Sequence, residues 1–91
     1  MKKLFKLSIG ANNQTGKLEK AKIFKIALNY YPEGFGYYEG FGVWKGGQEK
    51  SGFLEIISKR SEVLKLAKDL KQVLKQEAIL IQELQGGYSF V

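Results

Sequence analysis

The chain of 91 residues contains no cysteine and no histidine, and only one proline, one tryptophan and one arginine. Without cysteine it cannot form disulfides, and it lacks the thiolate and imidazole ligands that usually hold zinc, iron or copper. Nucleophilic Ser-His and Cys-His pairs are excluded for the same reason. No side chain has an ordinary pKa near neutrality, so acid–base catalysis would require a shifted carboxylate, lysine or tyrosine. We therefore predict a binding protein rather than an enzyme, with no metal and no cofactor.

Long apolar runs are also absent, because no stretch of the sequence approaches the roughly 20 residues needed to cross a bilayer. The opening MKKLFKLSIG is basic and then apolar, but Lys6 and Ser8 interrupt it, so it is typical of a strand rather than of a signal peptide. Apolar residues make up 44% of the chain and charged residues 26%, as in soluble globular proteins. We expect one domain over residues 1–91, located in the cytoplasm and not in a membrane.

Positive charge exceeds negative charge, with 15 basic and 9 acidic residues and a net charge of +6. Such an excess favours anionic partners such as nucleic acids, nucleotides or acidic proteins, although it also serves solubility alone. The lysines at positions 65, 68, 71 and 75 recur at helical spacing and have the same two interpretations, a solvated helix face or a footprint for phosphate. Arg60 lies close to this row and is the better bidentate partner for phosphate.

Hydrophobic periodicity divides the chain into six segments. Strands are predicted over 3–10, 36–45, 52–58 and 78–84. One helix is predicted over 17–30, and a second begins at Ser61 and ends at Gln76-Glu77. Right-handed connections in this β-α-β-β-α-β order predict a ferredoxin-like α+β fold, with a four-stranded antiparallel sheet and two helices on one face.

Local signals refine these boundaries. Thr15 and Ser61 are predicted to cap the two helices, and Pro32 is predicted to end the first helix near Tyr30. Residues 45–51 are expected to form the connection between the second and third strands. The last strand is almost continuously apolar, which favours a central position in the sheet.

Alternation along the strands sorts their side chains onto two faces of the sheet. We expect the helices to cover Phe5, Leu7, Ile9, Phe41, Val43, Leu54, Ile56, Ile79 and Ile81. The other face, which we call the open face, would carry Lys6, Ser8, Tyr38, Trp44, Phe53, Glu55, Ile57, Leu80 and Gln82. An exposed apolar surface of this kind marks a partner or ligand site, and we expect open faces to associate into a homo-oligomer. A one-residue shift in register would exchange the two sets.

The segment 33–47, EGFGYYEGFGVWKGG, interleaves glycine with aromatic residues. Glycine weakens a strand, so this density predicts either a sharp bend or the close approach of another backbone or a ligand. Residues 39–44 partly match the RNA-recognition-motif signature, since Gly40, Phe41 and Gly42 agree with it while Glu39 and Val43 do not. Binding of single-stranded nucleic acid through stacked aromatics therefore stays open as an alternative.

Phe41-Gly42-Val43-Trp44 in the second strand and Gln76-Glu77-Ala78-Ile79 before the last strand carry a wider resemblance. In these motifs the chain resembles small uncharacterised ferredoxin-like proteins of bacteria and phages. The resemblance implies an accessory or phage-encoded product. In that setting short binding proteins disarm host defences by capturing a protein or a nucleotide signal.

Together these features predict a non-catalytic, oligomeric module that captures an anionic nucleotide-like ligand, in a phage counter-defence role. The alternatives are a module that inhibits a host enzyme, with residues 86–91 adding to a sheet edge, a single-strand binder, and a small enzyme that uses Glu55 or a tyrosine for proton transfer. The predicted ligand-binding residues are Tyr37, Tyr38 and Trp44 for stacking, and Lys45, Lys50 and Arg60 for phosphate.

Overall fold

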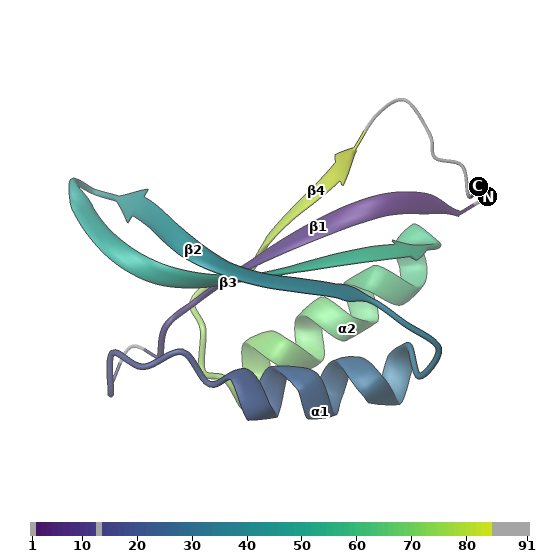
Figure 1. Cartoon of the computed structure of the whole chain (residues 1–91), viewed down its shortest axis with the longest axis horizontal. Helices are drawn as coiled ribbons and strands as arrows, with labels where there is room; N and C mark the ends of the chain where they lie inside the picture. Colours follow the sequence, from purple (N-terminus) through teal and green to yellow (C-terminus); the bar gives the residue numbers. More distant parts are fainter. Residues whose placement is uncertain (1, 13, 85–91) are drawn as a thin grey trace.

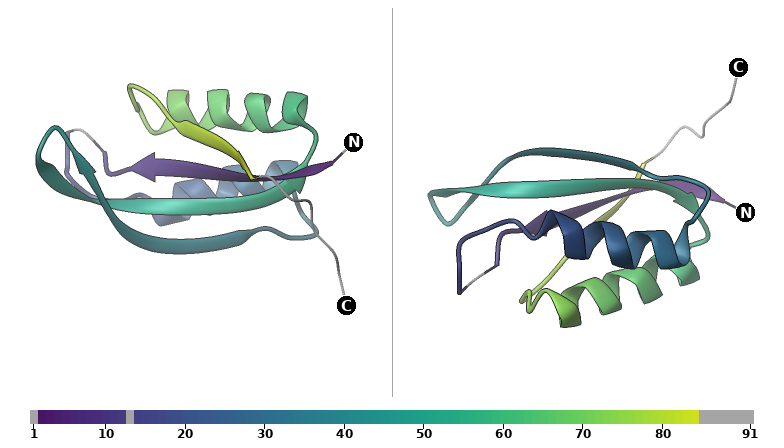
Figure 2. Two further views of the ribbon diagram at one scale, coloured as in Figure 1. Left: turned by 90° about the horizontal axis from the view of Figure 1, so that it is seen from above. Right: turned by 60° about the horizontal axis from the view of Figure 1, so that its bottom comes forward.

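A computed structural model describes residues 2–12 and 14–84, and for Trp44 the backbone alone. Its elements are β1 (Lys3–Gly10), α1 (Lys20–Tyr30), β2 (Gly36–Trp44), β3 (Gly47–Ser58), α2 (Arg60–Val73) and β4 (Leu80–Leu84). The strands form one antiparallel sheet in the order β2-β3-β1-β4. Both helices lie against one face of this sheet (Figures 1 and 2). The predicted ferredoxin-like α+β fold is confirmed.

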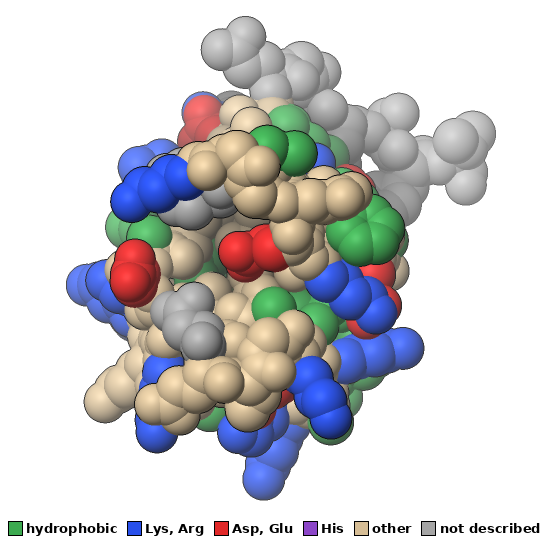
Figure 3. Space-filling view, turned by 90° about the vertical axis from the view of Figure 1, so that its left-hand side faces the viewer, with side chains coloured by type: hydrophobic (Ala, Val, Ile, Leu, Met, Phe, Trp, Pro, Cys, Tyr) green, Lys and Arg blue, Asp and Glu red, His purple; other side chains and the backbone are tan. Residues whose placement is uncertain are grey.

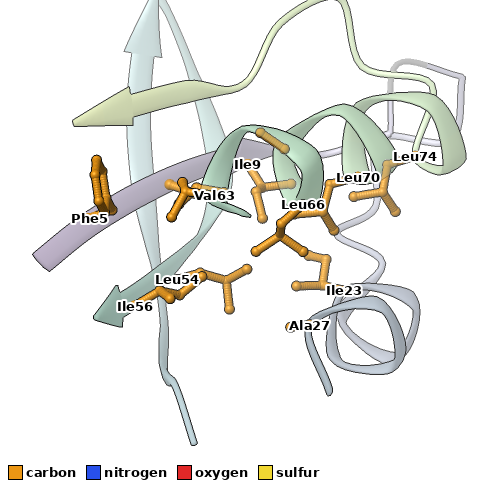
Figure 4. Close-up of a cluster of buried hydrophobic side chains, with 12 residues drawn as sticks. Phe5, Ile9, Ile23, Ala27, Leu54, Ile56, Val63, Leu66, Leu70 and Leu74 are labelled. Carbon is orange, nitrogen blue, oxygen red and sulfur yellow. The ribbon is translucent and has the colours of Figure 1, made fainter. Parts of the chain in front are cut away.

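The core lies between the helices and the sheet, and the side chains that build it are almost completely buried (Figure 4). Alternate residues of the two central strands point into it, as the sequence predicted for β1 and β3. The members are Phe5, Leu7 and Ile9 of β1, Leu54 and Ile56 of β3, Ile23 and Ala27 of α1, Val63, Leu66, Ala67 and Leu70 of α2, and Leu74 directly after α2. Ile79 and Ile81 pack against this core and are partly buried.

Two predictions about the strands are wrong, namely the burial of Phe41 and Val43 under the helices and the central position of the last strand. Phe41 and Val43 share a face with Tyr37, yet their side chains are 69% and 75% exposed. The reason is that the β2–β3 hairpin extends beyond the helices, so neither helix covers that face of its outer half (Figure 1). The last strand is not central: within residues 2–12 and 14–84, β4 pairs with β1 alone and lies at the edge, with Leu80 58% exposed.

The hairpin is tighter and longer than predicted. Lys45 and Gly46 form a two-residue turn in which both have positive φ, +50° and +77°. This conformation matches the twist of the flanking strands. Because the turn uses two residues, β3 begins at Gly47 rather than at Gly52, and the hairpin gains its uncovered outer half.

α1 ends at Tyr30, as predicted, whereas α2 ends at Val73, before the predicted Gln76-Glu77, and both helices begin at other residues than predicted. Asn12 organises the loop before α1, where its Oδ1 accepts a hydrogen bond from the backbone N–H of Thr15 at 3.1 Å. α1 therefore starts only at Lys20, and α2 starts at Arg60, with neither helix capped by a side chain. The predicted caps at Thr15 and Ser61 are wrong. Within residues 2–12 and 14–84, no helix has the length and apolar character required to span a bilayer.

Candidate functional site

The aromatic residues of β2 divide between the two faces of the sheet. Tyr37 points toward the helices, where its ring meets the ring of Phe24 edge-on, with centroids 4.8 Å apart at 85°. Its hydroxyl donates a hydrogen bond of 2.9 Å to Oε2 of Glu39. Burial, together with the adjacent Glu39 carboxylate, raises the pKa of Tyr37 far above its ordinary value. Tyr37 therefore packs on the face of the sheet that the helices cover, whereas Tyr38 lies on the opposite, open face.

The open face carries a cluster of two rings and one ammonium group, which we call the aromatic–lysine cluster (Lys6, Tyr38 and Phe53). The ring of Tyr38 stacks on that of Phe53, with centroids 5.0 Å apart and planes at 21°. Nζ of Lys6 lies 4.8 Å from the centroid of Phe53 and 5.7 Å from that of Tyr38. Tyr38 is 41% exposed. The cluster thus presents an accessible ring beside a positive charge.

The pairing of the strands explains why these three residues meet. Phe53 lies directly opposite Tyr38 on one side and opposite Ser8 on the other, in the middle of the sheet. Lys6 lies opposite Glu55, one pleat further along the same face. Side chains directly or diagonally opposite on one face of a sheet are close enough to touch. The alternation of side chains predicted that Lys6 and Phe53 lie on the open face, but it did not identify them as ligand-binding residues. Their contact with Tyr38 depends on the register between the strands, which the sequence pattern does not show.

Rings of the same chain account for two of the glycines. A Cβ at Gly52 would lie 2.9 Å from the hydroxyl oxygen of Tyr37, and one at Gly40 would lie 3.3 Å from Cε2 of Phe53. Each ring leans diagonally across the strand pair and occupies the space that a side chain would need. At Gly40, which belongs to the segment 33–47, the approaching group is therefore the ring of Phe53 and not the predicted backbone or ligand. At Gly52 it is the ring of Tyr37.

We expect Gly52→Ala to lower the free energy of unfolding by about 1–3 kcal/mol, because the new methyl group forces the ring of Tyr37 out of its place. Gly36→Ala is the matched control. A Cβ at Gly36 would meet its nearest neighbour at 3.6 Å, an ordinary contact. Urea denaturation of both variants followed by circular dichroism measures the difference. Equal stability of the two variants would contradict this account of the glycines.

The three cationic residues predicted to bind phosphate do not come together. Lys45 lies in the turn of the hairpin, and Nζ of Lys50 forms an ion pair of 3.3 Å with Oε1 of Glu39. Arg60 begins α2 at the opposite end of β3, about 35 Å from the turn at the usual rise of a strand. On the end of the molecule that carries the turn, basic side chains lie around the rim and form no single patch (Figure 3).

Trp44 is the last residue of β2 and pairs with Gly47. Its predicted stacking role concerns a side chain outside the part of the structure that is described. Of the six predicted residues, the structure therefore places Tyr38 in the aromatic–lysine cluster and puts the other described side chains elsewhere.

A chain of hydroxyl groups lies at the other end of the sheet. The hydroxyl of Tyr31 donates to Oγ of Ser58 at 2.9 Å, and Ser58 donates to Oε2 of Glu62 at 3.0 Å. Burial raises the pKa of Tyr31, while the hydrogen bond to Ser58 opposes that shift. The chain borders a hollow of about 350 Å³ that Lys2 also lines. Because Ser58 is only 1% exposed and must be hydrogen-bonded, we interpret the chain as a tether between α1, β3 and α2.

Chemically, the aromatic–lysine cluster is suited to a flat ring that carries an acidic group. Aromatic side chains stack on nucleobases, and an adjacent ammonium group attracts phosphate or carboxylate. The residues described in the structure form no group of three or more acidic side chains that could hold a metal ion. The stacked rings and the ammonium group beside them favour binding of an organic anion through stacking and charge.

The fold is that of small ferredoxin-like proteins, and comparison with known proteins agrees. No family model and no curated protein matches the chain. A DUF3240 family protein from Shewanella baltica OS155 superposes with a TM-score of 0.67 at 15% identity, over 98% of this chain and 97% of that one. A phage SAM lyase in its apo state superposes with a TM-score of 0.65 at 19% identity, over 96% and 86% respectively. The predicted resemblance to small bacterial and phage proteins is confirmed at the level of fold, and one of these two neighbours is an enzyme.

Proposed function

We propose that this protein binds a small nucleoside-containing molecule with an acidic group on the open face of its sheet, without transforming it. The observation that carries the proposal is the aromatic–lysine cluster, in which a ring that is 41% exposed lies beside an ammonium group. The base would stack on Tyr38, and the acidic group would pair with Lys6. Stacking on one aromatic side chain contributes about 1–3 kcal/mol per base.

Two further observations support this class of ligand. The net charge of +6 attracts anions to the molecule. The structural likeness to a phage SAM lyase supports an adenosine-containing ligand, since S-adenosylmethionine (SAM) contains adenosine and an amino-acid carboxylate. The same likeness to a phage protein supports the counter-defence role, in which the protein would withhold a small nucleotide-like molecule from its host.

The form of the cluster favours a small molecule over a single strand of nucleic acid. A strand needs a succession of aromatic platforms along a basic groove. Among the side chains that the structure describes, Tyr38 and Phe53 stack on each other and form one platform, with Lys6 next to it. For the alternative of a host-enzyme inhibitor, the one mode that the sequence suggests, sheet-edge addition by residues 86–91, concerns residues outside the described ones.

Isothermal titration calorimetry with adenosine, AMP, ATP and SAM tests the proposal. AMP and ATP, which are anions, are expected to bind more tightly than adenosine, and SAM is expected to bind through its adenosine ring and its carboxylate. Lys6→Gln is expected to weaken ATP binding about tenfold, the loss of one charge-assisted contact, while leaving adenosine nearly unaffected. Lys68→Gln is the matched control, because Lys68 is an exposed lysine on α2, away from the open face. No binding of any of the four ligands, or an equal loss in both variants, would contradict the proposal.

Chromatography of the same mixtures after incubation tests the absence of catalysis. We expect the ligand to be recovered unchanged. Conversion of SAM or ATP into a product at a rate proportional to protein concentration would make this protein an enzyme, as the phage lyase of the same fold is.

A further inference from the structure

The edge strands of this sheet lack the basic residues and prolines that usually protect such edges, and each carries a single glutamate, Glu39 in β2 and Glu83 in β4. An edge strand exposes unpaired backbone N–H and C=O groups, and proteins commonly place lysine or proline there to prevent pairing with another chain. The chain has 15 basic residues, yet the nine residues of β2 and the five of β4 contain none of them, and no proline. The two central strands carry Lys3, Lys6 and Lys50. Lysines therefore lie on the central strands and not on the edge strands, whereas a monomer is protected from pairing with other chains by lysines on its edge strands.

The single charge on β2 is neutralised within the same chain. Glu39 accepts a hydrogen bond of 2.9 Å from the hydroxyl of Tyr37 and forms an ion pair of 3.3 Å with Lys50. These two contacts, that of Tyr37 above all, lower the pKa of Glu39. A strand that approached β2 would therefore meet no unpaired charge.

The outer half of β2 is also apolar and uncovered. Phe41 and Val43 are 69% and 75% exposed, on the part of the hairpin that extends beyond the helices (Figure 1). A two-stranded ribbon alone is at best marginally stable in water, whereas a third strand adds hydrogen bonds and packing. This part of the molecule has the composition of a strand that is paired on both sides.

We propose that the free edge of β2 pairs with an edge strand of a second copy of this chain. A second copy suits this edge because antiparallel pairing of two β2 strands is symmetric, and closed symmetric assemblies are the common form of homo-oligomer. Pairing of β2 with β4 of another copy would also satisfy both unprotected edges and close a ring. Each arrangement extends the sheet sideways and leaves the aromatic–lysine cluster uncovered. The inference is therefore independent of the proposed ligand and uses a different surface from the face-to-face association predicted from the sequence.

Light scattering coupled to size exclusion tests this interface. The wild-type chain is expected at twice the 10.3 kDa of one chain if β2 pairs with β2, or at a higher multiple if β2 pairs with β4 in a ring. Val43→Lys places a charge at the edge and is expected to raise the dissociation constant by about tenfold or more. Phe41→Lys is a second variant with the same expected result, and circular dichroism verifies that both variants fold.

Val73→Lys is the matched control, because Val73 is 48% exposed but lies at the end of α2. It is expected to leave the mass of the assembly unchanged. A monomeric wild-type chain would overturn the inference. So would folded Val43→Lys and Phe41→Lys variants that keep the wild-type mass, or a Val73→Lys variant that dissociates as readily as they do.

Discussion

Tyr38→Leu is expected to weaken binding of an adenosine-containing ligand about 5-fold to 150-fold, which corresponds to the loss of one stacked base. Leucine retains apolar bulk at position 38 but has no π-face on which a base can lie. The substitution also removes the stack on Phe53, whose centroid lies 5.0 Å from that of Tyr38. Because that contact contributes about 0.5–1.5 kcal/mol to stability, the variant should remain folded. Calorimetric titration with ATP and with SAM measures the effect.

Phe41→Leu is the matched control for Tyr38→Leu. Both residues are exposed aromatics of β2, but Phe41 lies on the opposite face of the sheet from Tyr38. Its replacement should leave ligand affinity within about twofold of wild type, a difference of less than 0.5 kcal/mol. If Phe41→Leu and Tyr38→Leu weakened binding equally, the ligand would not occupy the open face, and the aromatic–lysine cluster would be only a packing feature.

Leu66→Ala is expected to lower the free energy of unfolding by about 2–5 kcal/mol, from the lost burial and the cavity that remains. Leu66 is completely buried between α2 and the sheet (Figure 4). A chain of 91 residues has a total stability of about 5–14 kcal/mol, so this single change removes a large part of it. The melting temperature should fall by about 10 °C or more. Thermal and urea unfolding followed by circular dichroism measure both quantities.

Leu64→Ala makes the same chemical change two residues away on the same helix. Leu64 is 37% exposed, and its replacement should cost less than about 1 kcal/mol. The pair separates burial from helix propensity, because both variants gain the same propensity from alanine. Equal destabilisation by Leu64→Ala and Leu66→Ala would mean that α2 does not pack on the sheet as described.

Local pattern predicted most of the fold. The alternation of Phe5, Leu7 and Ile9 and the helical spacing of Val63, Leu66 and Leu70 identify elements that each bury one face, and all six residues lie in the core. The order of elements then restricts the topology, because right-handed connections leave few arrangements of four strands. These signals are contained within short windows of sequence, which is why they could be read without coordinates.

Long-range geometry explains the errors. The composition of Leu80–Leu84 favours a central strand, but the position of β4 depends on β1, more than 70 residues earlier, which already pairs with β3 on its other side. Phe41 and Val43 alternate correctly and are still exposed, because the two-residue turn at Lys45 and Gly46 carries the hairpin past the ends of the helices. The local sequence pattern of β4 does not predict its edge position, and that of β2 does not predict the exposure of Phe41 and Val43.

The candidate site shows the same division. The exposed ring of Tyr38 follows from alternation along one strand, whereas its meeting with Lys6 and Phe53 depends on the register of three strands. Lys45 and Arg60 were both predicted to bind phosphate, but they lie at opposite ends of β3. Strand pairing, and not distance along the sequence, determines which residues are neighbours in a sheet.

By itself, the sequence determined which chemistry is excluded, which segments form strands and helices, and which fold they build, because composition and periodicity act locally. Only the tertiary structure decided that one aromatic ring, one partner ring and one ammonium group share the open face, and that β2 and β4 are the edges. Those relations arise from strand pairing between distant parts of the chain, whose free energy depends on the packing of the whole sheet and not on any single segment.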